Sequence, residues 1–262
     1  MDRRYVIVVA IALLILALGG IIALYTPAAA TASSPAEPSE LDGTFAVAES
    51  VSVDDSPFFS RRSIVDASTG EQRQILSFEE VTYDHYWTGD DRQYTKIVAK
   101  NEAHLAEQLA ETDGDIRYEY DDEPSVIVES TAAENATSAT DHTFPDTLTH
   151  SQLEMTAFEE TGTTSADGST LEVHEPKTGW TAVGDVAAER DQLYVADTDG
   201  EVHIDDDAQL RYANVTLERV DAETWGGYLL ERGETWTTSY EYEVSESLDD
   251  VTVRPGWVNE IR

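Results

Sequence analysis

The chain of 262 residues holds 53 acidic and 16 basic residues and no cysteine, and its formal net charge at pH 7 is -37. This charge repels nucleic acids at low salt, and the lack of cysteine excludes disulfides, thiolate metal sites and a cysteine nucleophile. Hydrophobic residues still make up 40% of the chain, which predicts a folded protein with a core and not a disordered acidic chain.

The chain begins with a short basic tip and a long apolar run. No charged residue lies between Tyr5 and Tyr25, and a helix of this length spans about 31 Å, the thickness of a bilayer's hydrocarbon core. Two arginines precede the run. The positive-inside rule therefore predicts a single-pass protein of the cell membrane, with residues 1–4 in the cytoplasm, a transmembrane signal anchor over residues 5–25 and the remainder outside.

Secretion after signal cleavage is the alternative. Small residues near positions 30–32 offer A-x-A sites to a signal peptidase, although the apolar run exceeds the usual signal-peptide core of about 7–15 residues. Residues 26–56 are rich in Ala, Ser, Pro and Glu, and we expect a spacer there, although "LDGTFAVAESVSV" within it also fits a first strand. Residues 57–262 are then the extracellular domain.

Strand signals dominate this domain. Alternating runs on both sides of Thr69-Gly70 predict a hairpin, and Asp-Gly pairs at 167–168 and 199–200 predict further turns. One helix is clear in "NEAHLAEQLAETDG", with Asn101 as its cap and Gly114 past its end. The fold class is α+β and β-dominated: an antiparallel curved sheet, either a half-barrel or a sandwich, with one clear helix.

The segment "VTYDHYWTGDDRQYTKIV", Val81 to Val98, is the candidate binding site. If Gly89-Asp90 or Thr88 to Asp91 forms the loop of a hairpin, the numbers of opposing residues sum to 179. Six side chains then share one face: Tyr83, His85, Trp87, Arg92, Tyr94 and Lys96. This mildly basic aromatic face could contact an anionic or amphiphilic ligand, and the alternative is a hairpin whose cross-strand pairs only stabilise the sheet.

Other motifs add little chemistry. The acidic stretch Asp197 to Asp207 lacks the ligand spacing of a calcium loop and is better explained as a turn with a solvated edge. The six histidines have no metal-ligand spacing, and no nucleophile elbow, phosphate loop or dinucleotide fingerprint is present. We therefore expect no catalytic residue, metal or cofactor. Asn135 and Asn214 begin N-x-[ST] sequons and are candidate glycosylation sites on the external side.

Two resemblances add to these predictions. Only three of the basic residues are lysines, and scarce lysine with abundant Asp and Glu resembles proteins of extreme halophilic archaea. The stretches "LEMTAFEETGTTSADGSTLEVHEP", "LYVADTDGEVHIDD" and "VTVRPGW", within Leu153 to Trp257, resemble haloarchaeal surface proteins related to LolA-type lipoprotein carriers. That resemblance implies a curved antiparallel sheet that holds an apolar cavity closed by helices.

The resulting hypothesis is a membrane-anchored surface protein of a halophile that acts by binding and not by catalysis. Its partners would be the membrane, through residues 5–25, and an apolar ligand or lipid. A structural or protein-interaction module of the envelope is a second hypothesis, and a surface hydrolase is a third. No interaction with nucleic acid is expected.

Overall fold

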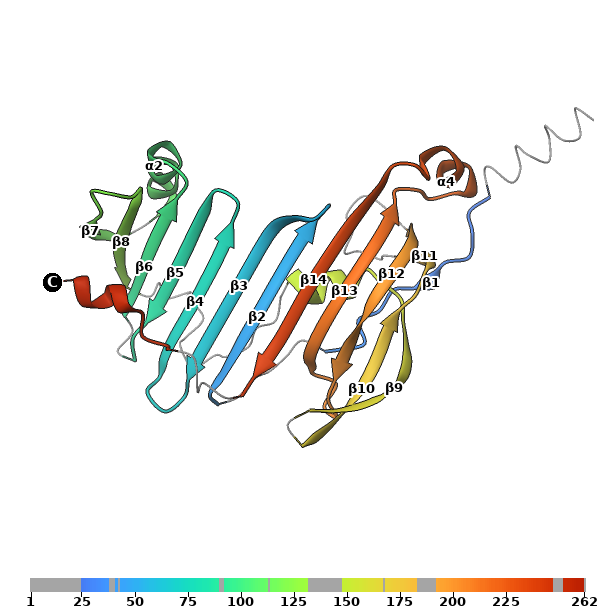
Figure 1. Ribbon diagram of the computed structural model, residues 1–262, viewed down its shortest axis with the longest axis horizontal. Coiled ribbons are helices and arrows are strands. Elements are labelled where there is room, and N and C mark those ends of the chain that lie inside the picture. The colour runs from blue at the N-terminus through green and yellow to red at the C-terminus, as the bar shows by residue number, and fades with distance from the viewer. Residues whose placement is uncertain are drawn as a thin grey trace, which may run out of the picture.

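The computed structural model describes residues 25–37, 41, 43–89, 92–112, 114–131, 148–166, 168–182, 192–246 and 252–261. The strands of these residues form one long, open sheet (Figure 1). In sheet order they are β1 (Ala30–Thr31), β11 (Gly179–Ala182), β12 (Gln192–Ile204), β13 (Leu210–Val220), β14 (Thr235–Ser245), β2 (Phe45–Val53), β3 (Ser56–Asp66), β4 (Glu71–Phe78), β5 (Val81–Trp87), β6 (Arg92–Ala99), β8 (Ser125–Thr131) and β7 (Asp115–Glu119). The hairpin of β9 (Phe158–Ala166) and β10 (Ser169–Pro176) joins β12. Neighbouring strands are antiparallel, except that β1 runs parallel to β11.

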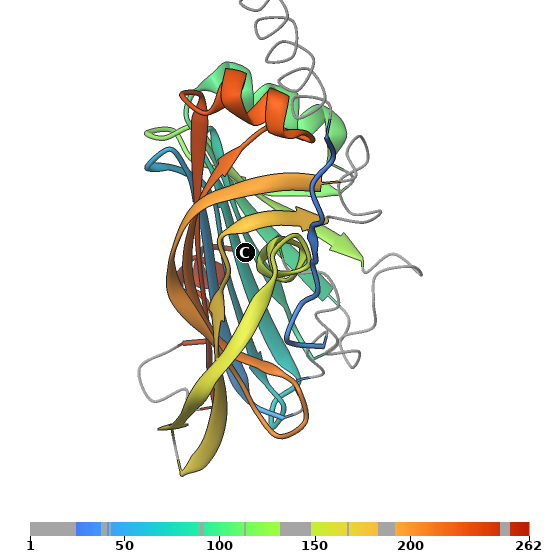
Figure 2. The same ribbon diagram turned by 90° about the vertical axis from the view of Figure 1, so that its right-hand side faces the viewer.

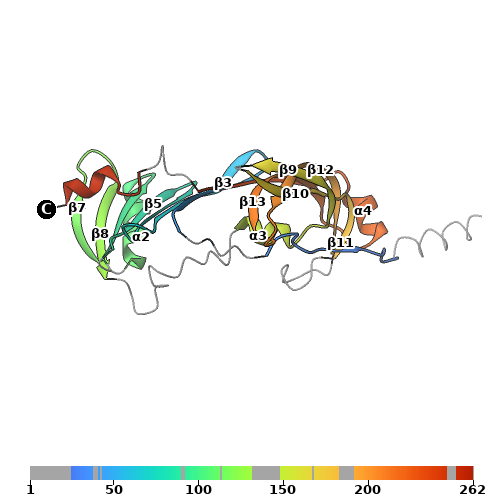
Figure 3. The ribbon, with the colours of Figure 1, turned by 90° about the horizontal axis from the view of Figure 1, so that it is seen from below.

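The sheet curls most strongly around α3 (Leu148–Leu153), as Figures 2 and 3 show. We call the face that carries α3 and α2 (Glu102–Glu111) the inner face, and the opposite face the outer face. Every second side chain of β2, β13 and β14 points inward, because side chains alternate along a strand. The inward set is apolar and packs with Leu153 of α3 into the main core, which includes Val47, Leu217 and Tyr240.

A second inner core lies under α2. Leu105 and Leu109 of the helix pack against Ile97, Val126 and Val128 of β6 and β8. The side chain of Asn101 accepts hydrogen bonds from the backbone N–H groups of Ala103 and His104 and so caps the helix. The predicted helix and its cap are therefore confirmed.

The C-terminal segment crosses the outer face. Its 3₁₀ helix η2 (Gly256–Glu260) places Trp257 and Val258 against Tyr86 and Ile127. Figure 3 shows η2 and α2 on opposite sides of the sheet. The strands β6 and β8 are thus covered on both faces.

The prediction of a β-dominated antiparallel fold is confirmed, and the open curved sheet is the form present in the described residues. The hairpin across Thr69-Gly70 is present as β3 and β4, with Gly70 at a φ of 72° in the turn. More helix is present than the one predicted, because α3 and α4 (Trp225–Glu231) also form. Both are short, so neither leaves a strong periodic signal in the sequence.

The spacer predicted over residues 26–56 is wrong in extent. β2 pairs with β14 and β3 in the middle of the sheet, and Ala30–Thr31 form β1. Phe45, Val47 and Val51 alternate with small or polar residues and point into the core. This alternation is the pattern of a half-buried strand, so the alternative of a first strand within "LDGTFAVAESVSV" is confirmed.

The turn predicted at Asp199-Gly200 is also wrong. Gly200 lies inside β12 opposite Val215, and the chain reverses later, at Asp205 to Ala208. Gly200 has a φ of 100°, and a Cβ atom there would lie 1.9 Å from the backbone oxygen of Asn214. A glycine is therefore needed at this position, because the two strands approach too closely for a side chain in the curled part of the sheet.

The predicted transmembrane segment lies outside the described residues except for Tyr25. Among the described residues, no helix is both long enough and apolar enough to span a membrane. Asn135 likewise lies outside the described residues.

Candidate binding face

The predicted hairpin of β5 and β6 forms, but its register differs by one residue from the prediction. Trp87 opposes Gln93, His85 opposes Thr95 and Tyr83 opposes Ile97. A one-residue shift moves all side chains of one strand to the other face of the sheet. The six predicted site residues are therefore divided, with three on each face. The prediction failed because it assumed a loop with an even number of residues.

Tyr83, His85 and Trp87 of β5 belong to the inner face and extend into a ladder of rings. In order from the start of β3 the rings are Phe59, Phe78, Tyr83, His85 and Trp87, with successive centroids 5.2, 6.5, 5.9 and 5.6 Å apart. We call these five side chains the aromatic ladder. Phe78 is 43% exposed, and the last three rings are half-buried, so the ladder is a partly accessible apolar strip along β5.

Neutral polar side chains flank the ladder. Across the sheet, His85 lies in one row with Ser63, Gln74 and Thr95. The side chain of Gln74 donates to Ser63 Oγ over 3.3 Å. Amide and hydroxyl groups of this kind fix the orientation of ligands in otherwise apolar sites.

His85 presents a defined tautomer to this face. Its Nδ1 lies 2.9 Å from Thr95 Oγ1 and 3.3 Å from the amide nitrogen of Gln93. Since an amide nitrogen only donates, Nδ1 is the acceptor and the ring proton is on Nε2. Burial lowers the pKa of His85, and the charge of Asp84 raises it less. The imidazole is thus neutral and offers an Nε2–H donor.

The four strands that carry the ladder, β3 to β6, place no acidic side chain on the inner face. The inward residues of β3 to β6 alternate in sequence, and none of them is Asp or Glu, although acidic residues are 53 of the chain's 262. The acidic residues of these four strands, such as Glu71 and Asp84, point outward. This face is therefore matched to an apolar or neutral ligand and not to a cation.

Two helices border the ladder. On one side, the hydroxyl group of Tyr83 donates to Gln108 Oε1 of α2. On the other side, Glu49 is completely buried at the N-terminal end of α3, where its Oε1 accepts from the backbone N–H of Thr149 over 2.6 Å. The Oε2 atom of Glu49 lies 2.8 Å from a guanidinium nitrogen of Arg61. A buried ion pair therefore connects α3 with β2 and β3.

A second buried cation holds α3 further along the sheet. Arg219 is fully buried and donates to Gln152 Oε1 over 3.0 Å, and its guanidinium lies 5.1 Å from the centre of the Trp236 ring. Burial lowers the pKa of Arg219 to about 10. Its contacts with Gln152 and Thr156 tie α3 to β13.

The other three predicted site residues lie on the outer face. Lys96 pairs with Glu123 at 2.9 Å and lies 4.1 Å from the centre of the Tyr120 ring. Tyr94 packs beside the Trp257 cluster, and Arg92 is exposed at the start of β6. These three residues do not share a surface with the ladder.

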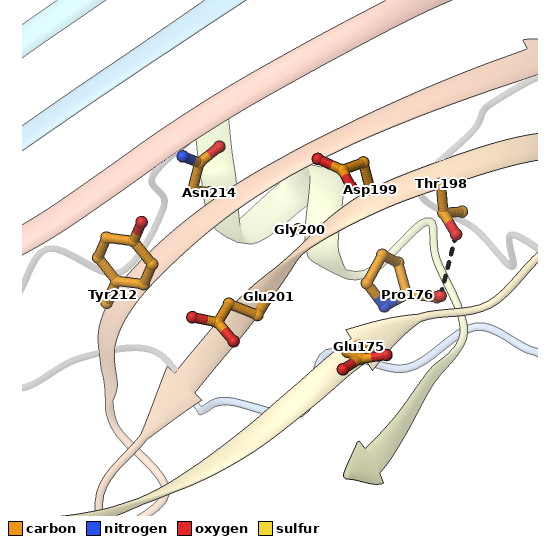
Figure 4. Close-up of a pocket in the computed structure, with 8 residues that line it drawn as sticks. All are labelled: Glu175, Pro176, Thr198, Asp199, Gly200, Glu201, Tyr212 and Asn214. Atoms are coloured by element: carbon orange, nitrogen blue, oxygen red, sulfur yellow. Dashed lines mark hydrogen bonds between the residues drawn. The ribbon is translucent and has the colours of Figure 1, made fainter. Parts of the chain in front are cut away.

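The outer face of the curled half is hollowed near Asn214. A shallow hollow of about 430 Å³ is lined by residues that include Asp199, Glu201 and Tyr212. Figure 4 draws these side chains as sticks. Asn214 is exposed on β13 at its border, so this sequon stays a candidate for glycosylation. Its acidic lining gives this hollow a chemistry opposite to that of the inner face.

Sequence reasoning missed Phe59, Phe78, Gln72 and Gln74. The strand alternation in residues 71–78 places the two glutamines on the same side as Phe78, but only the register of β4 against β5 shows that they face His85 and Trp87. That register depends on long-range pairing, which a local pattern does not reveal.

Comparison with known proteins gives no family. The chain matches no protein-family model, and no curated protein matches it. Among solved structures it has a likeness to a DUF1329 family protein from Desulfovibrio piger ATCC 29098, at 8% sequence identity and a TM-score of 0.21, over 84% of this chain and 90% of that one. At this TM-score the likeness carries no conclusion about fold or function.

Proposed function

We propose that this protein is a membrane-anchored binding module of a halophilic cell surface, and that the aromatic ladder holds an elongated apolar or amphiphilic ligand such as a lipid. The observation that carries the proposal is the ladder itself: five rings in one strip, flanked by neutral hydrogen-bonding groups, with no carboxylate at the inward positions of β3 to β6. Such a mixture of aromatic and few polar groups is characteristic of small-molecule sites. The proposal assigns no catalytic role to the chain.

The packing of residues 25–37 supports an uncleaved anchor over residues 5–25. Ala30 and Thr31 pair with β11, and the backbone N–H of Ala32 donates to Ala182 over 3.0 Å. Cleavage near residues 30–32 would cut through this strand and remove Pro27, which is buried. The chain is therefore folded up to the end of the proposed membrane span.

Photochemical labelling tests the proposed site. The full-length protein in nanodiscs of its native lipids is incubated with a fatty acid that carries a diazirine, and labelled peptides are identified by mass spectrometry after irradiation. Labels should lie in β3 to β6, and Trp87→Ala should reduce them. Tyr118→Ala is the matched control, because Tyr118 is a partly exposed aromatic residue on β7, away from the ladder. Labelling that is unchanged in Trp87→Ala, with folding intact, would refute the proposal.

A protein-interaction module is the second candidate, and the edge strand β7 favours it. All five residues of β7 are exposed, and Ile116 and Tyr118 are among them. An exposed edge strand with apolar side chains can pair with a strand of another protein. Substituting Ile116 with Lys should then abolish binding of an envelope partner and leave fatty-acid labelling unchanged.

A further inference from the structure

Large apolar side chains that remain exposed gather along one side of the sheet, where the ends of its strands and the turns between them lie. The described residues include eight of them, and six lie at this edge: Tyr25, Phe58, Phe78, Leu229, Leu230 and Trp236. Because neighbouring strands are antiparallel, the end of β13, the start of β14, the turn from β2 to β3 and the end of β4 meet at the same edge. We call it the α4 edge, since α4 lies there (Figure 1).

The helix α4 has the composition of a membrane-interface element. Trp225 and Tyr228 contact Trp180 and Tyr194, with ring centroids 4.4 to 6.5 Å apart. Leu229 and Leu230 are 55% and 86% exposed. Leucine side chains exposed to water forgo the favourable free energy that burying them in an apolar environment would give. Tryptophan and tyrosine are the residues that accumulate at the level of lipid headgroups.

The position of Tyr25, the first described residue, indicates what covers the α4 edge. The backbone N–H of Trp225 donates to the carbonyl oxygen of Tyr25 over 3.4 Å. Tyr25 is the last residue of the uncharged apolar run, so the proposed anchor ends in direct contact with α4. Figures 1 and 2 show α4 beside this N-terminal end of the described chain.

We infer that the α4 edge rests on the outer surface of the lipid bilayer, with Leu229 and Leu230 inserted at the level of the headgroups. The inference rests on the membrane anchor proposed above. Acidic residues such as Glu223 and Glu231 flank α4, so insertion is driven by apolar contact and not by attraction to anionic lipids. This orientation turns the Phe78 end of the aromatic ladder toward the bilayer, where an apolar chain can enter.

Single cysteines labelled with the environment-sensitive dye NBD test the inference, because the chain has no native cysteine. The full-length protein is reconstituted in phosphatidylcholine vesicles with and without a lipid that carries a quencher near its headgroup. Leu230→Cys is the test variant. Ala67→Cys is the control, because it is exposed in the turn between β3 and β4 at the opposite edge. Ile15→Cys, with a quencher deep in the acyl region, reports the anchor.

The quencher lipid should reduce the NBD emission at position 230 and leave the emission at position 67 unchanged. The reason is that an interfacial helix lies within about 10 Å of the boundary between headgroups and acyl chains. Quenching at position 15 without quenching at position 230 would overturn the inference and leave the anchor in place. A blue shift at position 230 without quenching would also overturn it, because a protein partner would then cover α4. Lack of quenching at position 15 would refute the anchor, and the inference with it.

Discussion

The buried carboxylate of Glu49 allows a sharp test of what holds α3 on the sheet. Replacing Glu49 with Gln leaves the shape almost unchanged but removes the negative charge beside Arg61. The two side chains are 0% and 12% exposed and 2.8 Å apart. Removing one partner of such a pair leaves an uncompensated buried charge, and this costs about 3–5 kcal/mol. For a protein of this size, that corresponds to a fall of about 6–20 °C in the midpoint of thermal unfolding.

The assay is urea unfolding followed by tryptophan fluorescence, in buffers of low and molar salt. Glu160→Gln is the matched control, because it makes the same change in net charge at an exposed position of β9. A buried pair is shielded from ions, so the loss in Glu49→Gln should be the same at both salt concentrations, whereas any effect of Glu160→Gln should depend on salt. If the free energies of unfolding of the two variants agree within about 1 kcal/mol, the ion pair contributes no more than a surface charge, and the reasoning is refuted.

Three further predictions concern the outer face, the ladder and the net charge. Trp257→Ala should lower the free energy of unfolding by about 3–5 kcal/mol, because it empties a buried site. Trp257→Phe should cost about 1.5–3 kcal/mol, the value of its 2.7 Å hydrogen bond to the carboxylate of Asp84, which also pairs with Arg73; equal costs in urea unfolding would contradict the packing argument. The pKa of His85, followed by NMR, should lie below the usual 6.5 because of burial. Since the unfolded chain then takes up the proton first, this residue lowers stability as the pH falls below 6.5 and has no effect at higher pH; a midpoint at or above 6.5 would rule this out. The net charge of -37 predicts that the thermal midpoint rises between about 0.1 M and 1 M salt, as the Debye length falls from about 10 to 3 Å; an unchanged midpoint in calorimetry would count against it.

Local patterns in the sequence predicted local structure well. The Asn101 cap and the turn at Gly70 follow from side-chain and backbone chemistry within a few residues, and both are present. Gly200 shows the limit of that approach. An Asp-Gly pair favours a turn, but here the curvature of β12 against β13 decides the conformation. Tertiary context overrides a local preference where two strands approach closely.

The composition of the candidate site depended on the register between β5 and β6, which differs from the predicted one by a single residue. The sequence correctly placed Tyr83, His85 and Trp87 on one face, since alternation within a strand is a local property. It placed Arg92, Tyr94 and Lys96 with them, and this was wrong, because the loop between the strands sets the pairing. The error changed the chemistry of the site from basic and aromatic to neutral and aromatic.

The corrected register gives the distribution of charge a physical meaning. A protein with this excess of carboxylates must place most of them in solvent, and each one needs an outward position. The sheet separates the two kinds of surface. Asp199, Glu201 and Glu241 lie on the outer face, whereas the inward positions of β3 to β6 carry rings, aliphatic groups, amides and hydroxyls, and their one cation, Arg61, is paired with Glu49. Because the inward positions of these four strands carry no carboxylate and are left half-buried next to an apolar edge, they are suited to the apolar part of a ligand. Under the proposed function, the outer face keeps the protein soluble at high salt, and the inner face and the α4 edge contact lipid.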